Sequence, residues 1–448
     1  MKATRIGATR NADGSLWPWA RTAGRLLAYL GVPAATLTAY AGVFVTVNVL
    51  TSFYLVAIFG LVALFRGAKV SPDLLNVCWF LAGWYLVLLA IELFHGGPFH
   101  YPPTRGGNYF TDYFPLLALP LFFVGLRETK VDLGVFERVM MATIVFSAGV
   151  CIYQFLVLGI DRPNAFSRNP IPLALVVMVW SLFVLSRALR AVKIDWIALS
   201  VALVGLIPIM LSGSKNVWVA TLAGYFALLL IWAQGAQRKS ALGLVAVAVV
   251  PLAWLLSRTA FVQARITEFV GDFGAFLMSG DTSGGSFGLR LAVIVSGFRA
   301  FLDRPIFGYG LVHGKIAAME HRPANFSSIA RLKHLHNEYV THLVAFGIPG
   351  LIFILSFLAL FVLMAARRED RAVRRFGVVV GCVLVPYLMA DVMFTLPEVY
   401  GVVFFAFGLI LFSPQKMPPA ETTSASARPP PEPVRSPSAE QVGGVGVP

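Results

Sequence analysis

Three histidines lie close together where a polar segment meets an apolar stretch long enough to span a membrane. They are His334, His336 and His342, within Leu-Lys-His-Leu-His-Asn-Glu-Tyr-Val-Thr-His-Leu-Val-Ala-Phe-Gly-Ile-Pro-Gly at 332–350. Histidine is suited to moving protons because its charge changes near neutral pH. Ionisable groups at a membrane boundary are costly and usually have a function. The segment therefore indicates proton-transfer chemistry at one face of a membrane protein.

His334 and His336 directly precede a predicted helix that begins near Asn337. Asparagine is a favourable N-cap residue, and a helix N-terminus carries a partial positive charge that attracts anions. A neutral histidine at this point could accept a proton from a bound hydroxyl group. The remaining histidines are interpreted as ordinary loop residues: His95, His100, His313 and His321.

The clustered histidines could instead be metal ligands. Their spacings place no pair at i and i+4 on one helical face, and no cysteine lies nearby. The spacing argues against a metal site, and no cofactor is predicted. All three cysteines fall in predicted spans and are interpreted as packing residues: Cys78, Cys151 and Cys382.

Positive charge on the same predicted face supplies a second set of candidates. Lys215 ends the sequence Leu-Ser-Gly-Ser-Lys beside an apolar span, while Arg265 and Arg290 flank a Gly/Ser-rich turn. Arginine binds phosphate through two parallel hydrogen bonds, so these cations would suit a lipid-linked diphosphate. The alternatives are a lysine that extends to the interface and arginines on a solvated surface. Lesser candidates are Arg105, Arg162 and Arg168.

Acidic residues are scarce near this face. Asp391, together with Glu398, lies at the predicted outer boundary and could orient a histidine or pair with an arginine. A structural ion pair explains Asp391 equally well. The candidates for supporting roles around the histidine and the cations are His334, Asn337, Asp391 and Arg105.

Composition places these residues in an integral membrane protein. Of 448 residues, 58% are hydrophobic and 13% charged, whereas soluble chains average about 25% charged residues. The mean hydropathy is +0.76. Apolar stretches long enough to cross a bilayer as helices recur along nearly the whole chain. Spans are predicted at 26–45, 47–65, 72–94, 112–126, 136–160, 170–186, 195–211, 216–233, 240–257, 339–364, 376–393 and 398–412.

The net charge of +14 follows membrane topology rather than an affinity for nucleic acid. With the N-terminus placed in the cytoplasm, 23 of the 36 Lys and Arg residues fall in cytoplasmic segments. Only 4 fall in short external loops, and 9 lie in the long segment 258–338. Cytoplasmic loops are enriched in Lys and Arg. Both termini are therefore predicted inside and 258–338 outside, and no cleavable signal peptide is evident.

The predicted organisation has five parts. They are an N-terminal segment (1–25), nine helices (26–257), an external loop carrying the candidate residues (258–338), three helices (339–412) and a tail (413–448). The tail is rich in Pro and Ser and is predicted to be disordered. The loop is expected to be ordered because it is rich in apolar and aromatic residues, and 291–302 could form an amphipathic helix.

Three motifs stand out: the sequence from His336 to Leu351, Gly-Leu-Arg290-Leu followed by Arg304-Pro-Ile-Phe-Gly-Tyr-Gly310, and Leu-Ser-Gly-Ser-Lys215. With the topology, they resemble the O-antigen ligase and polymerase superfamily of bacterial envelope glycosyltransferases over roughly residues 25–412. The first two motifs are specific in combination, and the third is weak alone. The family often has arginine where Lys215 stands, and lysine keeps the charge but lacks the planar fork.

The resemblance implies transfer of a polysaccharide from undecaprenyl diphosphate to a lipid A–core sugar at the periplasmic face of the inner membrane. His336 is then the catalytic histidine and Arg290 a diphosphate ligand, and Arg265 is added on chemistry alone. The expected fold is an all-α bundle of about twelve transmembrane helices with one long ordered periplasmic loop. The expected partners are the lipid-linked donor, the lipid A–core acceptor and membrane lipid, with no nucleic acid.

Two alternatives remain open. An O-antigen polymerase or a protein O-oligosaccharyltransferase would share the chemistry but use another acceptor. A transporter would be expected to carry ionisable residues or helix breaks at mid-membrane, whereas the polar candidates here collect at the external boundary. Broken helices could nevertheless occur at three prolines: Pro208, Pro251 and Pro386.

Overall fold

The structure is a bundle of α-helices with no β-strand among the residues that it describes. It is a computed structural model that describes residues 18–37, 49–96, 109–130, 132–165, 169–189, 194–233, 243, 258–279, 285–322 and 334–412. The helices are α1 (Pro18–Leu37), α2 (Val49–Phe65), α3 (Pro72–Phe94), α4 (Tyr109–Thr129), α5 (Leu133–Leu156), α6 (Pro170–Ala188), α7 (Trp196–Val204), α8 (Leu206–Leu211), α9 (Lys215–Trp232), α11 (Ala260–Ser279), α12 (Gly285–Asp303), α13 (Leu311–Glu320), α14 (Glu338–Ala366), α15 (Arg371–Leu388) and α16 (Pro397–Phe412).

Five helices are long and apolar enough to cross a membrane: α3, α5, α6, α9 and α14. Three shorter apolar stretches accompany them, at Phe53–Phe65, Trp196–Leu211 and Val399–Leu411. An α-helix satisfies its own backbone hydrogen bonds, which lipid cannot do. Several apolar helices of this length therefore indicate a multi-pass membrane protein. The count of twelve spans remains a prediction. The predicted span 240–257 lies almost entirely outside the described residues, and the tail 413–448 lies wholly outside them.

Several helix boundaries differ from the predicted spans; α15, for example, is Arg371–Leu388 and not 376–393, so Asp391 lies in the turn after the helix. Two of the differences have local reasons. α1 begins at Pro18 rather than at residue 26, because Arg21 and Arg25 lower the hydropathy of the first turns without opposing helix formation. The predicted span 195–211 is two helices that break at Gly205. Pro208 has no N–H group for the carbonyl four residues earlier, so the helix cannot continue unbroken through this point.

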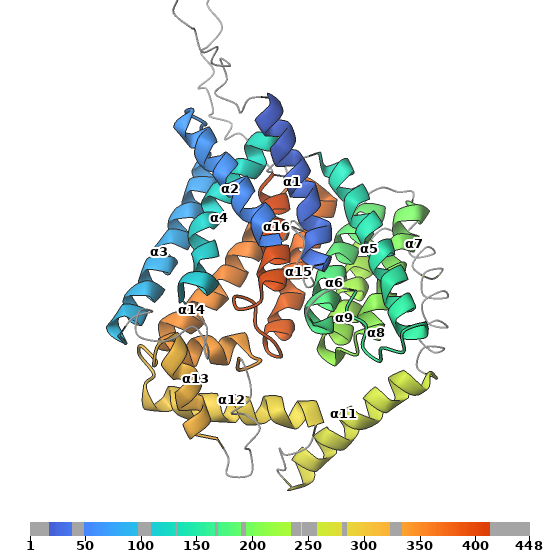
Figure 1. Ribbon diagram of the computed structural model, residues 1–448, viewed down its shortest axis with the longest axis vertical. Coiled ribbons are helices and arrows are strands. Elements are labelled where there is room, and N and C mark those ends of the chain that lie inside the picture. The colour runs from blue at the N-terminus through green and yellow to red at the C-terminus, as the bar shows by residue number, and fades with distance from the viewer. Residues whose placement is uncertain are drawn as a thin grey trace, which may run out of the picture.

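Helix α6 occupies the interior of the bundle. Almost all of its side chains are buried, and it contacts α5, α7, α8, α9, α15 and α16. A helix that is apolar all round favours such a position. In Figure 1, α14, α15 and α16 lie in the middle, with α2–α4 on one side and α5–α9 on the other.

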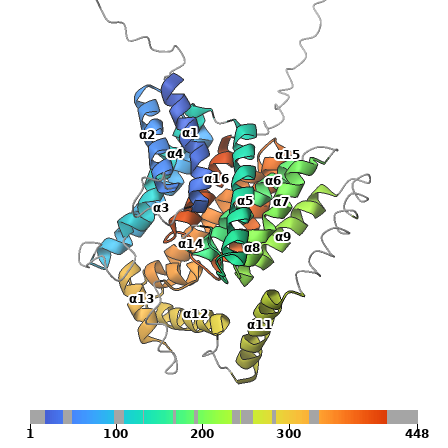
Figure 2. The ribbon, with the colours of Figure 1, turned by 45° about the vertical axis from the view of Figure 1, so that its right-hand side comes forward.

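The predicted external loop contains three helices that lie beyond one end of the bundle. Both views show α11, α12 and α13 together at this end, with α12 running across it (Figures 1 and 2). The stretch 291–302, predicted as an amphipathic helix, lies within α12. Val293 on α12 and Val340 and Val344 on α14 belong to one buried cluster. The first turns of α14 are thereby fixed against the loop.

Helix α14 is interrupted at Gly347, and near this point it makes backbone hydrogen bonds with the turn before α13. Gly347 has φ +64° and ψ −149°, which are not helical, and Pro349 follows. The carbonyls of Val344 and Ala345 instead accept hydrogen bonds from the N–H groups of Tyr309 and Gly310, at 2.9 and 2.8 Å. Glycine is needed at Gly347 because φ is positive there. Two motifs of the sequence, 304–310 and 336–351, thus pair backbone to backbone.

Candidate functional site

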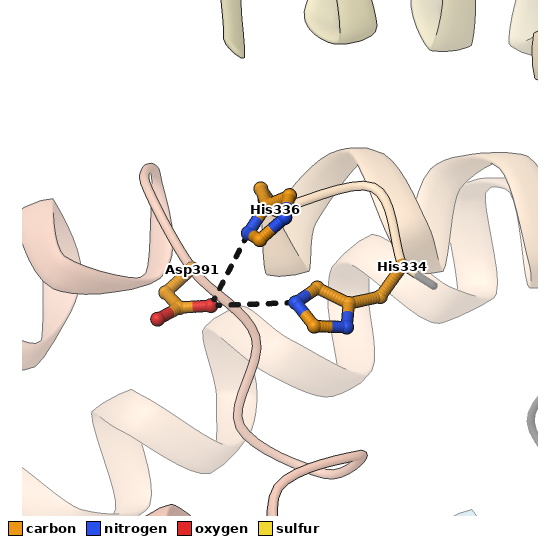
Figure 3. Close-up of side chains that lie close together, drawn as sticks. All are labelled: His334, His336 and Asp391. Atoms are coloured by element: carbon orange, nitrogen blue, oxygen red, sulfur yellow. Dashed lines mark ion pairs between the residues drawn. The ribbon is translucent and has the colours of Figure 1, made fainter. Parts of the chain in front are cut away.

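His334 and His336 face a single carboxylate, that of Asp391 (Figure 3). His336 Nδ1 lies 3.7 Å and His334 Nε2 lies 3.8 Å from Asp391 Oδ1. The two imidazole rings meet edge to face, with centroids 4.2 Å apart. The histidine side chains are 21% (His334) and 25% (His336) exposed, and that of Asp391 is 3% exposed. The rings are therefore open to a ligand, while the carboxylate behind them is buried.

The backbone at His336 is in an uncommon conformation. Its φ is +48°, in the left-handed region that few residues other than glycine adopt. Such residues persist where the surrounding structure holds them, and they cluster at functional sites. The Nδ1 atom of His336 is buried and makes no hydrogen bond. The ring is thus held near Asp391 at a separation beyond hydrogen-bond distance.

Asn337 connects this backbone to the turn that carries Asp391. As predicted, it is the N-cap of α14: its Oδ1 accepts a hydrogen bond from Val340 N at 2.9 Å. Its Nδ2 donates to the Met389 carbonyl at 2.8 Å. The same side chain therefore starts α14 and holds the 389–393 turn against it.

The Asp391 carboxylate is oriented within its own turn. Val392 N donates to Oδ1 at 2.9 Å, and the Tyr387 hydroxyl donates to Oδ2 at 3.3 Å. From the other side, Glu338 Oε2 accepts a hydrogen bond from Met393 N at 2.6 Å. Fixed donors on both oxygens leave Oδ1 directed toward the two histidines.

Arg290 reaches the same turn from α12. Its Nε donates to the Ala390 carbonyl at 3.1 Å, next to Asp391 in the chain. The arginine predicted as a diphosphate ligand and the histidine predicted as the base therefore flank one short turn. They come from two motifs of the sequence that are separated by α13.

Lys215 and Arg265 form a second group of cations. Lys215 is the first residue of α9 and Arg265 lies on α11, and both face the carboxylate of Glu268. The distances to Glu268 Oε2 are 3.4 Å from Lys215 Nζ and 3.0 Å from an Arg265 guanidinium nitrogen. Burial raises the pKa of the Glu268 carboxyl, but the hydrogen bond from Arg265 and the charge of Lys215 outweigh burial and hold the pKa below its usual value.

Arg162 links the two groups. Its Nε donates to the Ser212 carbonyl at 2.8 Å, in the loop that leads to Lys215. The pKa of Arg162 is lowered by burial and then by the positive charges of Arg265 and Arg290. The charges of Arg265 and Arg290 therefore both act on Arg162. Arg162 was only a lesser candidate in the sequence, where nothing local distinguishes it from other loop arginines.

Residues 199–355 match the family model described as O-antigen ligase. The match supports assigning the chain to the O-antigen ligase family. The matched region contains α8, α9, α11, α12 and α13 and the first turns of α14. It therefore includes the candidate histidines and cations except Arg105, Arg162 and Arg168, and it ends before Asp391. No curated protein matches the chain.

The third histidine of the segment 332–350, His342, is separate from the other two. His342 is completely buried, its Nε2 lies 2.9 Å from the Tyr113 hydroxyl, and its Nδ1 lies 3.3 Å from Glu338 Oε1. This histidine therefore belongs to a buried polar network that connects α14 to Tyr113 on α4. The sequence reasoning missed Glu338, although an acidic residue in the first turn of a helix is a recognisable stabilising signal.

Two histidines and an aspartate of this site could hold a metal ion. One ligand atom each from His334, His336 and Asp391 lies within 4.8 Å of the others. Ligands of one zinc ion stand roughly 3.3 Å apart, so small shifts would bring these atoms into range. The histidine spacing predicted no metal site because the third group, Asp391, is distant in the sequence.

Two of the candidate residues, Arg105 and Arg168, lie outside the described residues. Glu92 was not predicted and helps to position the loop: its Oε2 accepts a hydrogen bond from Leu311 N at 2.7 Å, at the start of α13. A carboxylate suits a helix N-terminus. Nothing near Glu92 in the sequence indicates this role, because Glu92 is a single charged residue within an apolar span.

Proposed function

We propose that this protein is an O-antigen ligase. It transfers a polysaccharide from undecaprenyl diphosphate to a sugar hydroxyl of the lipid A–core, at the periplasmic face of the inner membrane. The observation that carries the proposal is the convergence of Arg290 and His336 on the turn of Asp391. The family match supports transferase chemistry of the ligase or polymerase type.

His336 acts in this mechanism as the general base. Asp391 favours the tautomer with the proton on Nδ1, which lies 3.7 Å from the carboxylate, so that Nε2 can accept a proton. The acceptor oxygen attacks the anomeric carbon of the donor and its proton passes to Nε2. The bond from that carbon to the diphosphate oxygen breaks, and the configuration of the carbon inverts. Buried Asp391 stabilises the imidazolium that forms.

Arg290, Arg265 and Lys215 stabilise the departing diphosphate. Its negative charge increases as the carbon–oxygen bond breaks, and preorganised cations bind it more strongly at that stage. Arg162 adds a further positive charge to this face. A diphosphate stabilised in this way is a good leaving group, so the proposed mechanism requires no nucleotide and no metal ion.

The test of the function is transfer by the purified protein with defined lipid-linked donors, together with deletion of its gene. If the protein is a ligase, deletion leaves lipid A–core uncapped while long polymer accumulates on undecaprenyl diphosphate. If it is a polymerase, the lipid A–core carries single repeat units instead. Lipid A–core that carries single repeat units in the deletion strain would show that the proposed acceptor is wrong. His336 would still be the base in that case.

The proposed orientation predicts the outcome of reporter fusions. A reporter fused after residue 320 should report the periplasm, and fusions after residues 68, 239 and 370 should report the cytoplasm. The reason is the excess of Lys and Arg in the cytoplasmic segments. Alkaline phosphatase and green fluorescent protein fusions measure the two sides. A cytoplasmic signal at residue 320 would contradict a periplasmic site.

Chelator-treated protein is expected to keep its transfer rate. The cations of the site supply the charge stabilisation that a metal ion would otherwise provide. The rate is measured before and after EDTA treatment, with the metal content determined in parallel. A loss of activity that one specific divalent ion restores would instead assign a metal to His334, His336 and Asp391.

A further inference from the structure

A single carboxylate lies between two of the cations assigned to the donor. Glu268 Oε2 is 3.4 Å from Lys215 Nζ on α9 and 3.0 Å from Arg265 on its own helix, α11. The three side chains are between 21% and 33% exposed. An oxygen anion therefore already bridges the two cations, as a phosphate oxygen would.

Lys215 depends on this carboxylate for its charge partner. Its Nζ is buried and makes no hydrogen bond, and it faces Glu268 and the ring of Phe269, 5.8 Å from the ring centroid. Both contacts come from α11, so the pair joins α11 to α9. Among the ion pairs of the described residues, Glu268 is the partner of Lys215, so its removal would take away the negative charge that Lys215 faces.

The surroundings favour a second anion. Burial lowers the pKa of Arg162, the positive charges of Arg265 and Arg290 lower it further, and the charge of Glu268 has the opposite effect. Arg162, Arg265, Arg290 and Lys215 thus lie on this face, and Glu268 pairs with two of them, Lys215 and Arg265. Such a concentration of positive charge attracts anions.

We propose that Glu268 occupies the position of an anionic ligand in the donor-free protein and that the diphosphate of the lipid-linked donor displaces it. The carboxylate returns when the spent carrier leaves, so Glu268 weakens diphosphate binding and assists release. This inference rests on the proposed function, because the same cations must bind the donor diphosphate.

The strength of the ion pairs is compatible with displacement. Ion pairs between partly exposed side chains contribute little to stability, because solvent screens them. A diphosphate carries more charge and more acceptor oxygens than a carboxylate, and it can contact several cations at once. Displacement of Glu268 from Lys215 also leaves its contact with Arg265 available, since both residues lie on α11.

The test measures binding of undecaprenyl diphosphate to the purified protein in nanodiscs, so it does not depend on transfer. Glu268→Gln should bind it about two- to fivefold more tightly than wild type, as expected for loss of a weak competing ion pair. Asp272→Asn is the matched control, because it removes the same charge one turn further along α11 and should change the affinity less. Glu268→Ala is the second variant, for use if Glu268→Gln folds poorly, and it should also bind undecaprenyl diphosphate more tightly than wild type.

Two outcomes separate this inference from the proposed function. Unchanged or weaker binding by both Glu268 variants would show that Glu268 does not compete with the diphosphate. Unchanged binding by Arg290→Ala, Arg265→Ala and Lys215→Ala alike would show that these cations do not bind the diphosphate. In that second case the donor site of the proposed function is wrong.

Discussion

Replacement of His336 by alanine should lower the rate of polysaccharide transfer by about 10²–10⁴-fold, the contribution typical of a general base. The imidazole is partly exposed and makes no hydrogen bond through Nδ1, so its loss should affect chemistry more than packing. The rate is measured under single-turnover conditions with purified protein. Membrane expression should stay near the wild-type level.

A second variant separates the ring from the backbone. His336→Asn supports the same positive φ, because asparagine tolerates the left-handed region, but it has no imidazole. It should be as impaired as the alanine variant. His334→Ala should be milder, and His321→Ala, whose ring pairs with Asp303 elsewhere in the loop, should transfer normally. Wild-type activity of His336→Asn would exclude His336 as the base.

Replacement of Arg290 by alanine should reduce kcat/KM for the lipid-linked donor by about 10²–10³-fold, as for the loss of one preorganised donor to a developing anion. The guanidinium both contributes charge and bonds the Ala390 carbonyl at 3.1 Å. Arg290→Lys should also be impaired, because an ammonium group keeps the charge but cannot reproduce the planar fork. Initial rates at limiting donor measure the effect.

Arg299 provides the matched control for Arg290. It is an exposed arginine on the same helix, and Arg299→Ala should transfer at the wild-type rate. Thermal unfolding of each variant tests whether Arg290 only supports the 389–393 turn. Full activity of Arg290→Ala at limiting donor, with or without a loss of stability, would overturn its role in diphosphate binding.

Local patterns in the sequence predicted some of the helices around the site, but not α11 or α13, and they extended the predicted span 376–393 beyond the end of α15 at Leu388. The predicted span at 72–94 coincides with α3, and Asn337 caps α14 as its position before the apolar run indicated. Hydropathy and capping act over a few neighbouring residues, so they can be recognised in the sequence without knowledge of packing. The same locality explains the error at α1, where two arginines moved the predicted start away from Pro18.

The sequence also brought His334, His336 and the cations to attention by residue type, but it left their partners open. Asp391 could have oriented a histidine, paired with an arginine or formed a structural ion pair. Only the packing of α14 against the 389–393 turn brings its carboxylate to 3.7 Å from His336 and 3.8 Å from His334. Hydrogen bonds from Asn337 and to Glu338 establish that contact.

The ion pairs that Glu268 makes could likewise not be predicted from the sequence. Lys215, Arg265 and Glu268 are each ordinary charged residues, and their contact exists because α11 lies against the start of α9. The backbone pairing of the 304–310 turn with the broken α14 has the same origin. Residue types and helix signals are local properties of the chain, whereas the neighbours of a side chain depend on how distant helices pack. The sequence by itself therefore determined the class of protein and the candidate residues, and the tertiary structure decided which of them meet.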